Sequence, residues 1–234
     1  MKLEICANSY LSAINAQKAG ADRIELCSEL SVGGITPSYA ILKKISEEIT
    51  IPVNVLIRPR SGDFCYIDDE FSLMKENILL CKKLGFNGIV SGVLNTDNSI
   101  DIERTKELVE LSKPLSFTFH RAFDCVDNPQ ESLQQLIDLK VDRILTSGQK
   151  LKAENGIYLL IELQQLAKDK LIILPGSGIN AKNARIFKVA KFKEIHASAS
   201  KIIDKESTIF FDKTPQTISD FENIKEILNV IKDA

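Results

Sequence analysis

The sequence predicts an α/β fold, a closed (β/α)8 TIM barrel that forms a single domain. Short apolar runs alternate with segments of helical periodicity along the whole chain of 234 residues. Successive runs begin roughly 20–34 residues apart, which leaves room for the crossover helix that parallel strands require. Eight such units match the usual barrel size of about 200–250 residues. A doubly wound open sheet remains the structural alternative.

The apolar runs are the expected strands, and the periodic segments between them are the expected helices. In chain order the strands are Leu3–Ala7, Arg23–Cys27, Val53–Arg58, Gly88–Gly92, Ser116–His120, Arg143–Ser147, Leu171–Pro175 and Glu194–Ala197. The helices are Ser9–Ala19, Tyr39–Glu48, Glu70–Leu84, Ile102–Leu111, Pro129–Lys140, Gly156–Ala167 and Asn180–Ala190. A long loop at about 198–216 should precede an amphipathic C-terminal helix built on Ile218, Phe221, Ile224, Ile227, Leu228 and Ile231.

Several helix ends carry recognisable signals. Thr36 and Asn128 each precede a proline and are expected to be N-caps, with Glu131 completing a capping box for Asn128. Gly20 and Gly85 follow the last periodic residue of their helices, as C′ glycines do. These signals support the proposed division into elements.

The composition limits the classes of function. Lys and Arg total 30 against 32 for Asp and Glu, a net charge of −2, so the chain lacks the basic excess that binds nucleic acid. No stretch approaches the roughly 18 apolar residues of a membrane span, and Glu4 interrupts the apolar run that a signal peptide needs. Five irregularly spaced cysteines are typical of reduced thiols. We therefore expect one cytoplasmic domain over residues 1–234 that binds neither nucleic acid nor membrane.

Strand alternation predicts a polar barrel lumen. If the apolar side of each strand faces the helices, the opposite side faces inward. Unpaired ionised carboxylates there would cost several kcal/mol, so the inward glutamates need partners, for which the arginines and histidines are the candidates. The alternative to a functional site is a polar network that only stabilises the barrel. The inward residues are Glu4, Cys6, Arg23, Glu25, Cys27, Asn54, Leu56, Arg58, Ser116, Thr118, His120, Glu194 and His196.

The glycine-rich segment after the seventh strand is a candidate anion site. Gly176, Ser177 and Gly178 follow that strand and precede a helix, where barrels often bind phosphate through backbone N–H groups. Ser198 after the eighth strand could add a hydroxyl donor. A tight turn that only needs positive φ explains the glycines equally well.

Two arginines lie where the third strand ends. Arginine offers a planar fork for carboxylate or phosphate. We expect Arg58 to pair with a barrel glutamate and Arg60 to contact a bound ligand.

The two histidines of the chain both fall on inward positions near the same barrel mouth. His120 is a candidate general acid or base, together with Glu25 or Asp124, and His196 is a candidate substrate-binding residue. Glu4 is a further candidate substrate-binding residue. A hydrogen-bonded core histidine is the structural alternative.

Cys6 and Cys27 occupy corresponding inward positions on strands expected to lie about 4.8 Å apart. Two thiolates at that separation suit a soft ion such as Cu(I), whereas two buried free cysteines acting as small apolar residues are the structural alternative. Zinc is disfavoured because the sequence contains neither HExxH nor paired CxxC motifs.

Seven motifs together carry a resemblance to a known family. They are Glu4–Ser9, Ala21–Cys27, Gly33–Ser38, Ile57–Arg60 with Gly62–Phe64, Phe119–Asp124, Arg143–Gly148 and Pro175–Ile179. Over about residues 1–200 the chain resembles the CutC family, whose members are described as copper homeostasis proteins. The chain departs from the family pattern at Ser177, where a glycine is more usual.

The resemblance implies a cytoplasmic (β/α)8 barrel, a homodimer or larger homo-oligomer, and a link to copper tolerance or Cu(I) binding, without naming a reaction. It implies copper ligation by Cys6 and Cys27. The mouth residues it implies are Glu4, Glu25, Arg58, Arg60, His120, Asp124 and His196.

Two functions stay open. The first is a copper-handling protein whose thiols hold Cu(I). The second is an enzyme that acts on a small anionic or phosphorylated metabolite, with Arg60 and the Gly176–Gly178 segment holding the anion and His120 moving a proton. The family resemblance favours copper, and no organic cofactor is expected.

Overall fold

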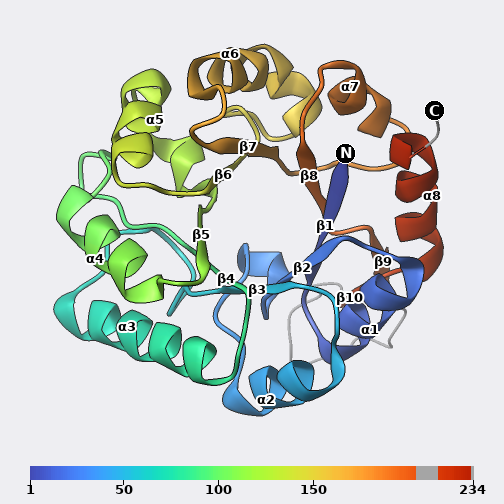
Figure 1. The fold of residues 1–234 in the computed structure, drawn as a ribbon, viewed down its shortest axis with the longest axis horizontal. Coiled ribbons are helices and arrows are strands. Elements are labelled where there is room, and N and C mark those ends of the chain that lie inside the picture. Colours follow the sequence, from blue (N-terminus) through green and yellow to red (C-terminus); the bar gives the residue numbers. More distant parts are fainter. Residues whose placement is uncertain (204–215, 233–234) are drawn as a thin grey trace, which may run out of the picture.

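The computed structural model describes residues 1–203 and 216–232. Eight parallel strands form one sheet in the order β7-β6-β5-β4-β3-β2-β1-β8, and β8 also lies beside β7, so the sheet curves into a barrel. The helices form an outer ring around it (Figure 1). The strands are β1 Lys2–Ala7, β2 Arg23–Leu26, β3 Val53–Leu56, β4 Gly88–Ser91, β5 Ser116–Phe119, β6 Arg143–Thr146, β7 Ile172–Pro175 and β8 Glu194–Ala197. The predicted single-domain (β/α)8 barrel is confirmed.

The outer ring holds the crossover helices and the C-terminal helix. They are α1 Tyr10–Ala19, α2 Tyr39–Glu48, α3 Asp68–Lys83, α4 Ile102–Ser112, α5 Pro129–Asp138, α6 Ile157–Ala167, α7 Ala184–Val189 and α8 Phe221–Lys232. Three 3₁₀ turns, η1 Leu30–Val32, η2 Arg121–Cys125 and η3 Ala153–Gly156, lie in loops after strands. No helix among the residues described is long and apolar enough to cross a membrane.

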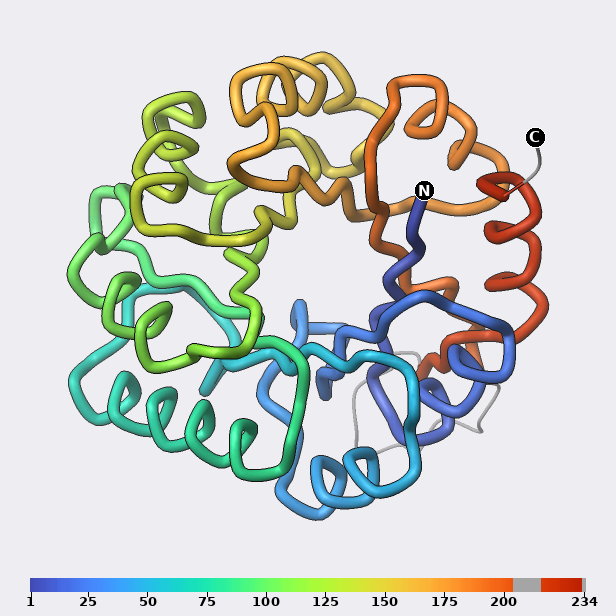
Figure 2. The backbone as a smooth tube through the Cα atoms, viewed as in Figure 1, coloured from blue at the N-terminus to red at the C-terminus, as the bar shows by residue number. Residues whose placement is uncertain are grey.

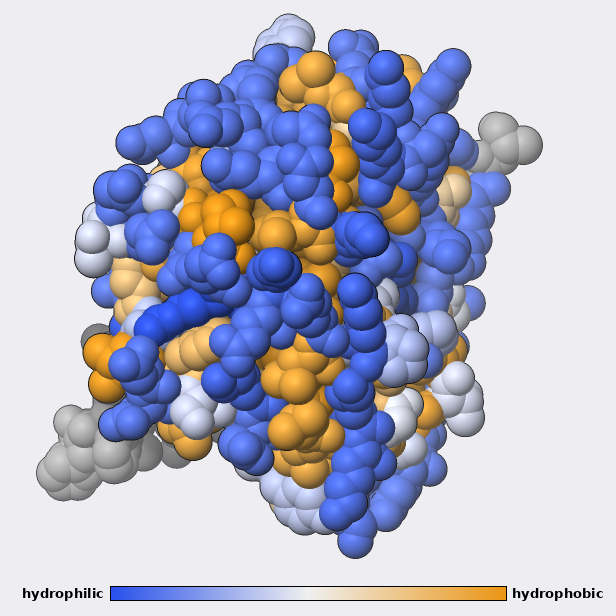
Figure 3. Space-filling model, turned by 60° about the vertical axis from the view of Figure 1, so that its left-hand side comes forward, coloured by the Kyte–Doolittle hydropathy of each residue, from blue (hydrophilic) through white to orange (hydrophobic). Residues whose placement is uncertain are grey.

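The helix layer separates the barrel from solvent. Hydrophilic side chains cover most of the face seen in Figure 3, and apolar side chains appear in narrower strips between them. This is expected for amphipathic helices that bury their apolar side against a sheet.

One predicted N-cap is wrong. Helix α2 spans Tyr39–Glu48 as expected, but Ser38 and not Thr36 lies in its N-cap position. The Thr36 hydroxyl instead accepts a hydrogen bond from Arg58 N at 2.8 Å and lies 3.1 Å from Arg58 O. Thr36 therefore ties the β2–α2 loop to the end of β3.

The Asn128 cap is confirmed. Its side chain accepts a hydrogen bond from Glu131 N at 3.2 Å, and Pro129 is the first residue of α5. We expect Asn128→Ala to lower the free energy of unfolding by about 1 kcal/mol, because a helix N–H loses its acceptor. Chemical denaturation checks this. Asn128→Ser, which keeps a capping oxygen, should stay close to wild type, and equal losses in both variants would contradict the assignment.

Buried side chains confirm the predicted strand alternation. Leu3, Ile5 and Ile24 belong to the large core between strands and helices. Cys6, Cys27, Leu56 and Val90 form a separate small cluster inside the barrel. Inward and outward residues therefore pack in two distinct layers.

The chain closes with a two-stranded ribbon and helix α8. In the connection predicted at about 198–216, strand β9 (Ser200–Ile202) pairs antiparallel with β10 (Thr217–Ser219), and residues 204–215 lie outside the described residues. Ile218 therefore lies in a strand, and its predicted place in the C-terminal helix is wrong. Helix α8 lies beside α1, so the two ends of the fold meet (Figure 2). Ser219 Oγ also donates to Cys6 O at 3.1 Å, which fixes the ribbon to the first strand.

Candidate functional site

A cavity of about 490 Å³ opens at the carboxyl ends of the strands, where barrels of this class carry their functional groups. Its volume falls within the range of small-molecule sites. The predicted site residues that line it are Cys6, Glu25, Arg58, His120, Asp124, Ser177, Gly178, His196 and Ser198. Glu4, Cys27, Arg60 and Gly176 are not among the lining residues.

A chain of ion pairs runs through the barrel interior below this cavity. Arg143 Nε lies 2.9 Å from Glu194, and Arg23 bridges Glu194 and Glu4 at 2.5 Å each. Glu4 in turn lies 2.8 Å from His196 Nδ1. The strand register brings them together, because Glu4 is paired with Arg23 on one side and with His196 on the other. The expected partners of Glu4 and Glu194 are therefore present.

These contacts hold Glu4 and Glu194 as carboxylates. Burial alone would raise the pKa of Glu4, but Arg23 and His196 lower it to about 2. Burial likewise opposes ionisation of Glu194, and Arg23 and Arg143 outweigh it so that its pKa lies below the usual value. The network is buried and paired, which is the condition under which charges persist in a protein interior.

Glu25 lies at the edge of this network and makes a weaker contact with it than Glu4 and Glu194 do. Its closest cationic neighbour is His196 Nδ1 at 3.6 Å, and its Oε2 has no hydrogen-bond partner within the described chain. Burial raises the pKa of Glu25 to about 7, against the attraction of His196. For His196, burial is outweighed by Glu25, Cys6 and Glu4, so its pKa lies well above its usual 6.5. The cavity floor thus holds a carboxyl group that changes charge near neutral pH beside an imidazolium.

The pKa of Glu25 predicts a pH dependence of stability. A carboxyl with a raised pKa binds more protons in the folded state, so the free energy of unfolding falls as pH rises from about 4.5 to 7. The full effect is on the order of 3 kcal/mol. Glu25→Gln should remove that decline, as measured by urea denaturation at several pH values.

Glu162→Gln is a matched control, because Glu162 is exposed on helix α6. It should leave the slope unchanged. An unchanged slope in Glu25→Gln would show that other groups produce the dependence.

His120 is held as a neutral imidazole on the opposite wall. Its Nδ1 accepts a hydrogen bond from Ala122 N at 3.2 Å, which assigns the ring hydrogen to Nε2. Nε2 has no partner among the residues described. Burial, followed by the charge of Arg58, lowers the pKa of His120 to about 3. His120 therefore offers an N–H donor across the physiological pH range.

The expected pairing of Arg58 with a barrel glutamate is wrong. Its guanidinium instead donates to backbone carbonyls, from Nη1 to Val32 O at 3.0 Å and Gly34 O at 2.9 Å, and from Nη2 to Gly62 O at 2.8 Å. Arg58 follows the end of β3, four residues beyond Asn54, the register partner of Glu25, so its side chain starts at the level of the loops and not beside the inward carboxylates. Arg58 joins the loops that follow β2 and β3.

Arg60 and Asp124 are each engaged with neighbouring groups. Arg60 lies 2.6 Å from Glu70 and 2.9 Å from Asp63, at the outer side of the loop. Asp124 accepts hydrogen bonds from Thr146 Oγ1 at 2.5 Å and Ser147 N at 3.0 Å. Ligand contact by Arg60 and proton transfer by Asp124 remain predictions.

The segment after β7 adopts the tight turn that its glycines suggest. Ser177 has φ +88° and Gly178 φ +71°, both in the left-handed region, where Ser177 occupies a conformation that favours glycine. Asn180 N already donates to the side chain of Asn183 at 2.9 Å, and the following helix α7 has only six residues. Anion binding by Gly176, Ser177, Gly178 and Ser198 remains a prediction.

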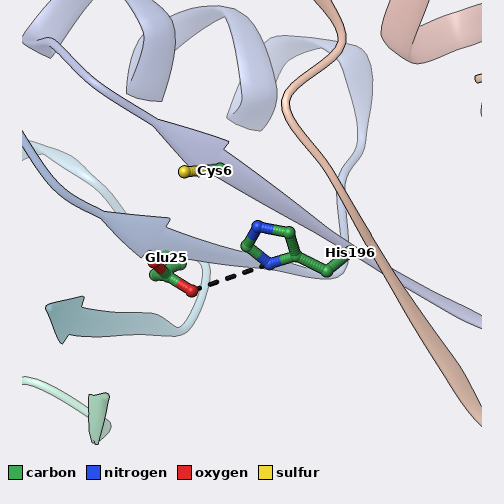
Figure 4. A group of neighbouring side chains, drawn as sticks. All are labelled: Cys6, Glu25 and His196. Atoms are coloured by element: carbon green, nitrogen blue, oxygen red, sulfur yellow. Dashed lines mark ion pairs between the residues drawn. The ribbon is translucent and has the colours of Figure 1, made fainter. Parts of the chain in front are cut away.

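The two inward cysteines meet next to the cavity, which Cys6 lines and Cys27 does not. Cys6 Sγ and Cys27 Sγ are 3.6 Å apart, and both residues are buried. The hydrogen bond to Cys27 and burial raise the pKa of the Cys6 thiol well above its usual value. Figure 4 shows Cys6 beside Glu25 and His196, and the potential ligand atoms of these three residues lie within 4.8 Å of one another.

Sequence reasoning missed several contributors, among them Phe64 and Arg143. Phe64 lines the cavity, and its only signal was its place in one of the family motifs. Arg143 supports Glu194 from the start of β6. Alternation applied to that strand would have placed Arg143 inward, because its neighbour Ile144 belongs to the outer core.

Comparisons with known proteins agree with this architecture. The sequence model of the CutC family matches residues 1–201. A CutC family protein of Edwardsiella ictaluri is 46% identical over 223 residues, covering 95% of this chain and 88% of the relative. One from Klebsiella pneumoniae is 47% identical over 199 residues, covering 85% and 80% respectively.

A solved structure extends the match to three dimensions. The CutC protein of Streptococcus agalactiae, provisionally described as a copper homeostasis protein, superimposes with a TM-score of 0.80 at 33% identity. The match covers 85% of this chain and 98% of that one. The chain therefore belongs to the CutC family.

Proposed function

We propose that this protein binds Cu(I) through the thiolates of Cys6 and Cys27 and thereby takes part in copper homeostasis. The observation that carries the proposal is the 3.6 Å separation of the two buried sulfur atoms, next to the cavity that Cys6 lines. The provisional description of the Streptococcus agalactiae relative as a copper homeostasis protein supports it.

The donor set fits the chemistry of Cu(I). Thiolate sulfur is a soft ligand that selects Cu(I), and two metal–sulfur bonds of about 2.3 Å can span a gap of this size. His196 is a candidate third ligand, because its ring nitrogen lies within 4.8 Å of Cys6 Sγ. Imidazole is also an accepted copper ligand.

The surrounding residues shield the two sulfur atoms from water and orient His196. Leu56 and Val90 pack with the two cysteines and keep the sulfur atoms away from bulk water. Glu4 lies 2.8 Å from His196 Nδ1 and so fixes the orientation of the ring, as partners of metal-binding histidines commonly do. Bound Cu(I) would be cargo held by sulfur, with the thiol protons released on binding.

The proposal also includes a cytoplasmic location and a homo-oligomeric assembly. All five cysteines are free thiols, which persist in the reducing cytoplasm. The homodimer or larger homo-oligomer implied by the family resemblance belongs to the same proposal, and sedimentation analysis of the purified protein tests it.

An anaerobic Cu(I) titration in competition with a chromophoric chelator tests the copper proposal. One ion per chain that withstands the chelator is expected for the wild type and for Cys65→Ser, whose thiol lies away from the cavity floor. Copper that the chelator removes completely from the wild type would contradict the proposal.

A second candidate function is an enzyme that acts on a small anionic or phosphorylated metabolite. The observation in its favour is a cavity that brings a buried carboxyl, Glu25, and the N–H donor of His120 to one space. A carboxyl with a pKa of about 7 is suited to accept and return a proton.

Small carboxylates and sugar phosphates incubated in D2O test this second candidate. Deuterium incorporation seen by NMR should be present with the wild type and Glu162→Gln and lost in Glu25→Gln. Incorporation that survives Glu25→Gln, or none with any compound, would count against the enzyme.

A further inference from the structure

We propose that Arg58, Phe64 and His120 form a subsite for the carboxylate or phosphate group of a small molecule. The subsite occupies one wall of the cavity, and two of its members, Arg58 and His120, are among the mouth residues to which the family resemblance assigns no ligand. The inference deepens the second candidate function by assigning the anionic end of its substrate, but binding itself requires neither a reaction nor copper.

Arg58 carries a buried positive charge without an acidic partner. Only 4% of the residue is exposed, and no carboxylate of the described chain lies within 4.0 Å of its guanidinium. Its three hydrogen bonds all go to backbone carbonyls, and Nε has no partner within the described chain. A buried cation is stabilised by a paired anion, but the nearby carboxylate of Asp63 is paired with Arg60, and the Tyr66 hydroxyl and the backbone carbonyls offer Arg58 only dipoles.

His120 adds a second donor of fixed orientation. It is 5% exposed, its Nδ1 is occupied by Ala122 N, and its Nε2 has no partner in the part of the chain described. A buried N–H that makes no hydrogen bond costs free energy, so it calls for an acceptor.

Phe64 contacts both donor residues. The Arg58 guanidinium carbon lies 4.9 Å from the centre of the Phe64 ring, and the His120 ring centre lies 4.8 Å from it on an inclined plane. All three side chains line the same cavity. Arg58 is also close enough to His120 for its charge to help lower the pKa of the imidazole, so the guanidinium and the imidazole N–H belong to one region of the cavity wall.

A bound anion would give Arg58 a negatively charged partner and His120 Nε2 a hydrogen-bond acceptor. The guanidinium fork matches carboxylate and phosphate oxygens, and an acceptor oxygen also suits a neutral imidazole N–H. A purely structural role for Arg58 explains its three carbonyl contacts. It does not explain why Arg58 Nε and His120 Nε2 both lack a hydrogen-bond partner within the described chain. Arg60 is a poorer anchor, because Glu70 and Asp63 already occupy its guanidinium.

Histidine-ring 1H–15N NMR of the copper-free protein tests the subsite. Inorganic phosphate and acetate are titrated separately at constant ionic strength, with sodium chloride as the reference salt. We expect at least one of them to shift His120 Nε2 saturably, and the responding anion identifies whether the group is phosphate or carboxylate. Arg58→Lys, which keeps the charge but loses the fork, should weaken binding about ten- to hundred-fold.

Two further variants complete the design. His120→Asn keeps an acceptor for Ala122 N while removing the Nε2 donor, and backbone amide shifts should report similarly weakened binding even if Arg58→Lys does not fold. Arg185→Met removes an exposed arginine on α7 and should bind as the wild type does.

The subsite is contradicted if chloride produces the same His120 shift, or if neither Arg58→Lys nor His120→Asn weakens binding. Repeating the titration with Cys6→Ser/Cys27→Ser separates the proposals. Anion binding that persists there stands whether or not the copper site exists.

Discussion

Replacing Arg23 with Met is expected to lower the free energy of unfolding by about 3–5 kcal/mol, the usual cost of breaking a buried ion pair. Arg23 lies 2.5 Å from both Glu4 and Glu194, and its side chain is 9% exposed. Met fills a similar volume, so the loss comes from leaving two buried carboxylates without their shared cation. Glu4 would then approach the protonated form, because Arg23 is a main cause of its pKa of about 2.

Chemical denaturation at pH 7 measures this effect. Lys193→Met breaks an ion pair whose side chains are 60% and 93% exposed and should stay within about 0.5 kcal/mol of wild type. Neutralising both acids in Arg23→Met/Glu4→Gln/Glu194→Gln should restore part of the loss. A single Arg23→Met variant as stable as Lys193→Met would show that the network does not stabilise the barrel.

Cys6→Ser/Cys27→Ser is expected to weaken Cu(I) binding by on the order of ten-thousand-fold. Zinc sites with four ligands gain about 10–16 kcal/mol, so each lost ligand costs on the order of a hundred-fold in affinity. Competition with a chromophoric chelator measures the change. Each single variant should show an intermediate loss, while Cys65→Ser should match the wild type.

Copper affinity should also depend on pH. The thiol of Cys6 has a raised pKa and must lose its proton when it binds the ion. Below that pKa, affinity should rise about ten-fold per pH unit for each proton released. A pH-independent affinity would indicate ligands other than thiols.

The sequence predicted which side chains enter the barrel and that Cys6 and Cys27 would be neighbours, but not which inward charged residues pair with one another. Alternation placed Glu4, Cys6 and Glu25 inward, and the two separate core clusters confirm that rule. The partners depend on how adjacent strands are staggered, and alternation within one strand carries no information on stagger. The register that sets Glu4 opposite both Arg23 and His196 is visible only in the assembled sheet.

The wrong predictions for Arg58 and Thr36 both concern contacts made by loops. The carbonyls that hold Arg58 belong to Val32, Gly34 and Gly62, in segments without periodicity. Thr36 looked like a helix cap because it precedes a proline, yet its hydroxyl bonds to the backbone of Arg58. Such contacts between loops distant in sequence decide the shape of the cavity and leave little trace in local composition.

The central claim is that the sulfur atoms of Cys6 and Cys27 hold Cu(I). X-ray absorption at the copper edge of the anaerobically loaded protein tests it most directly, because it identifies the atoms bonded to the metal. We expect a Cu(I) edge with two sulfur ligands in the wild type and none in Cys6→Ser/Cys27→Ser. A wild-type spectrum with only nitrogen or oxygen ligands, or sulfur ligands that persist in the double variant, would contradict it.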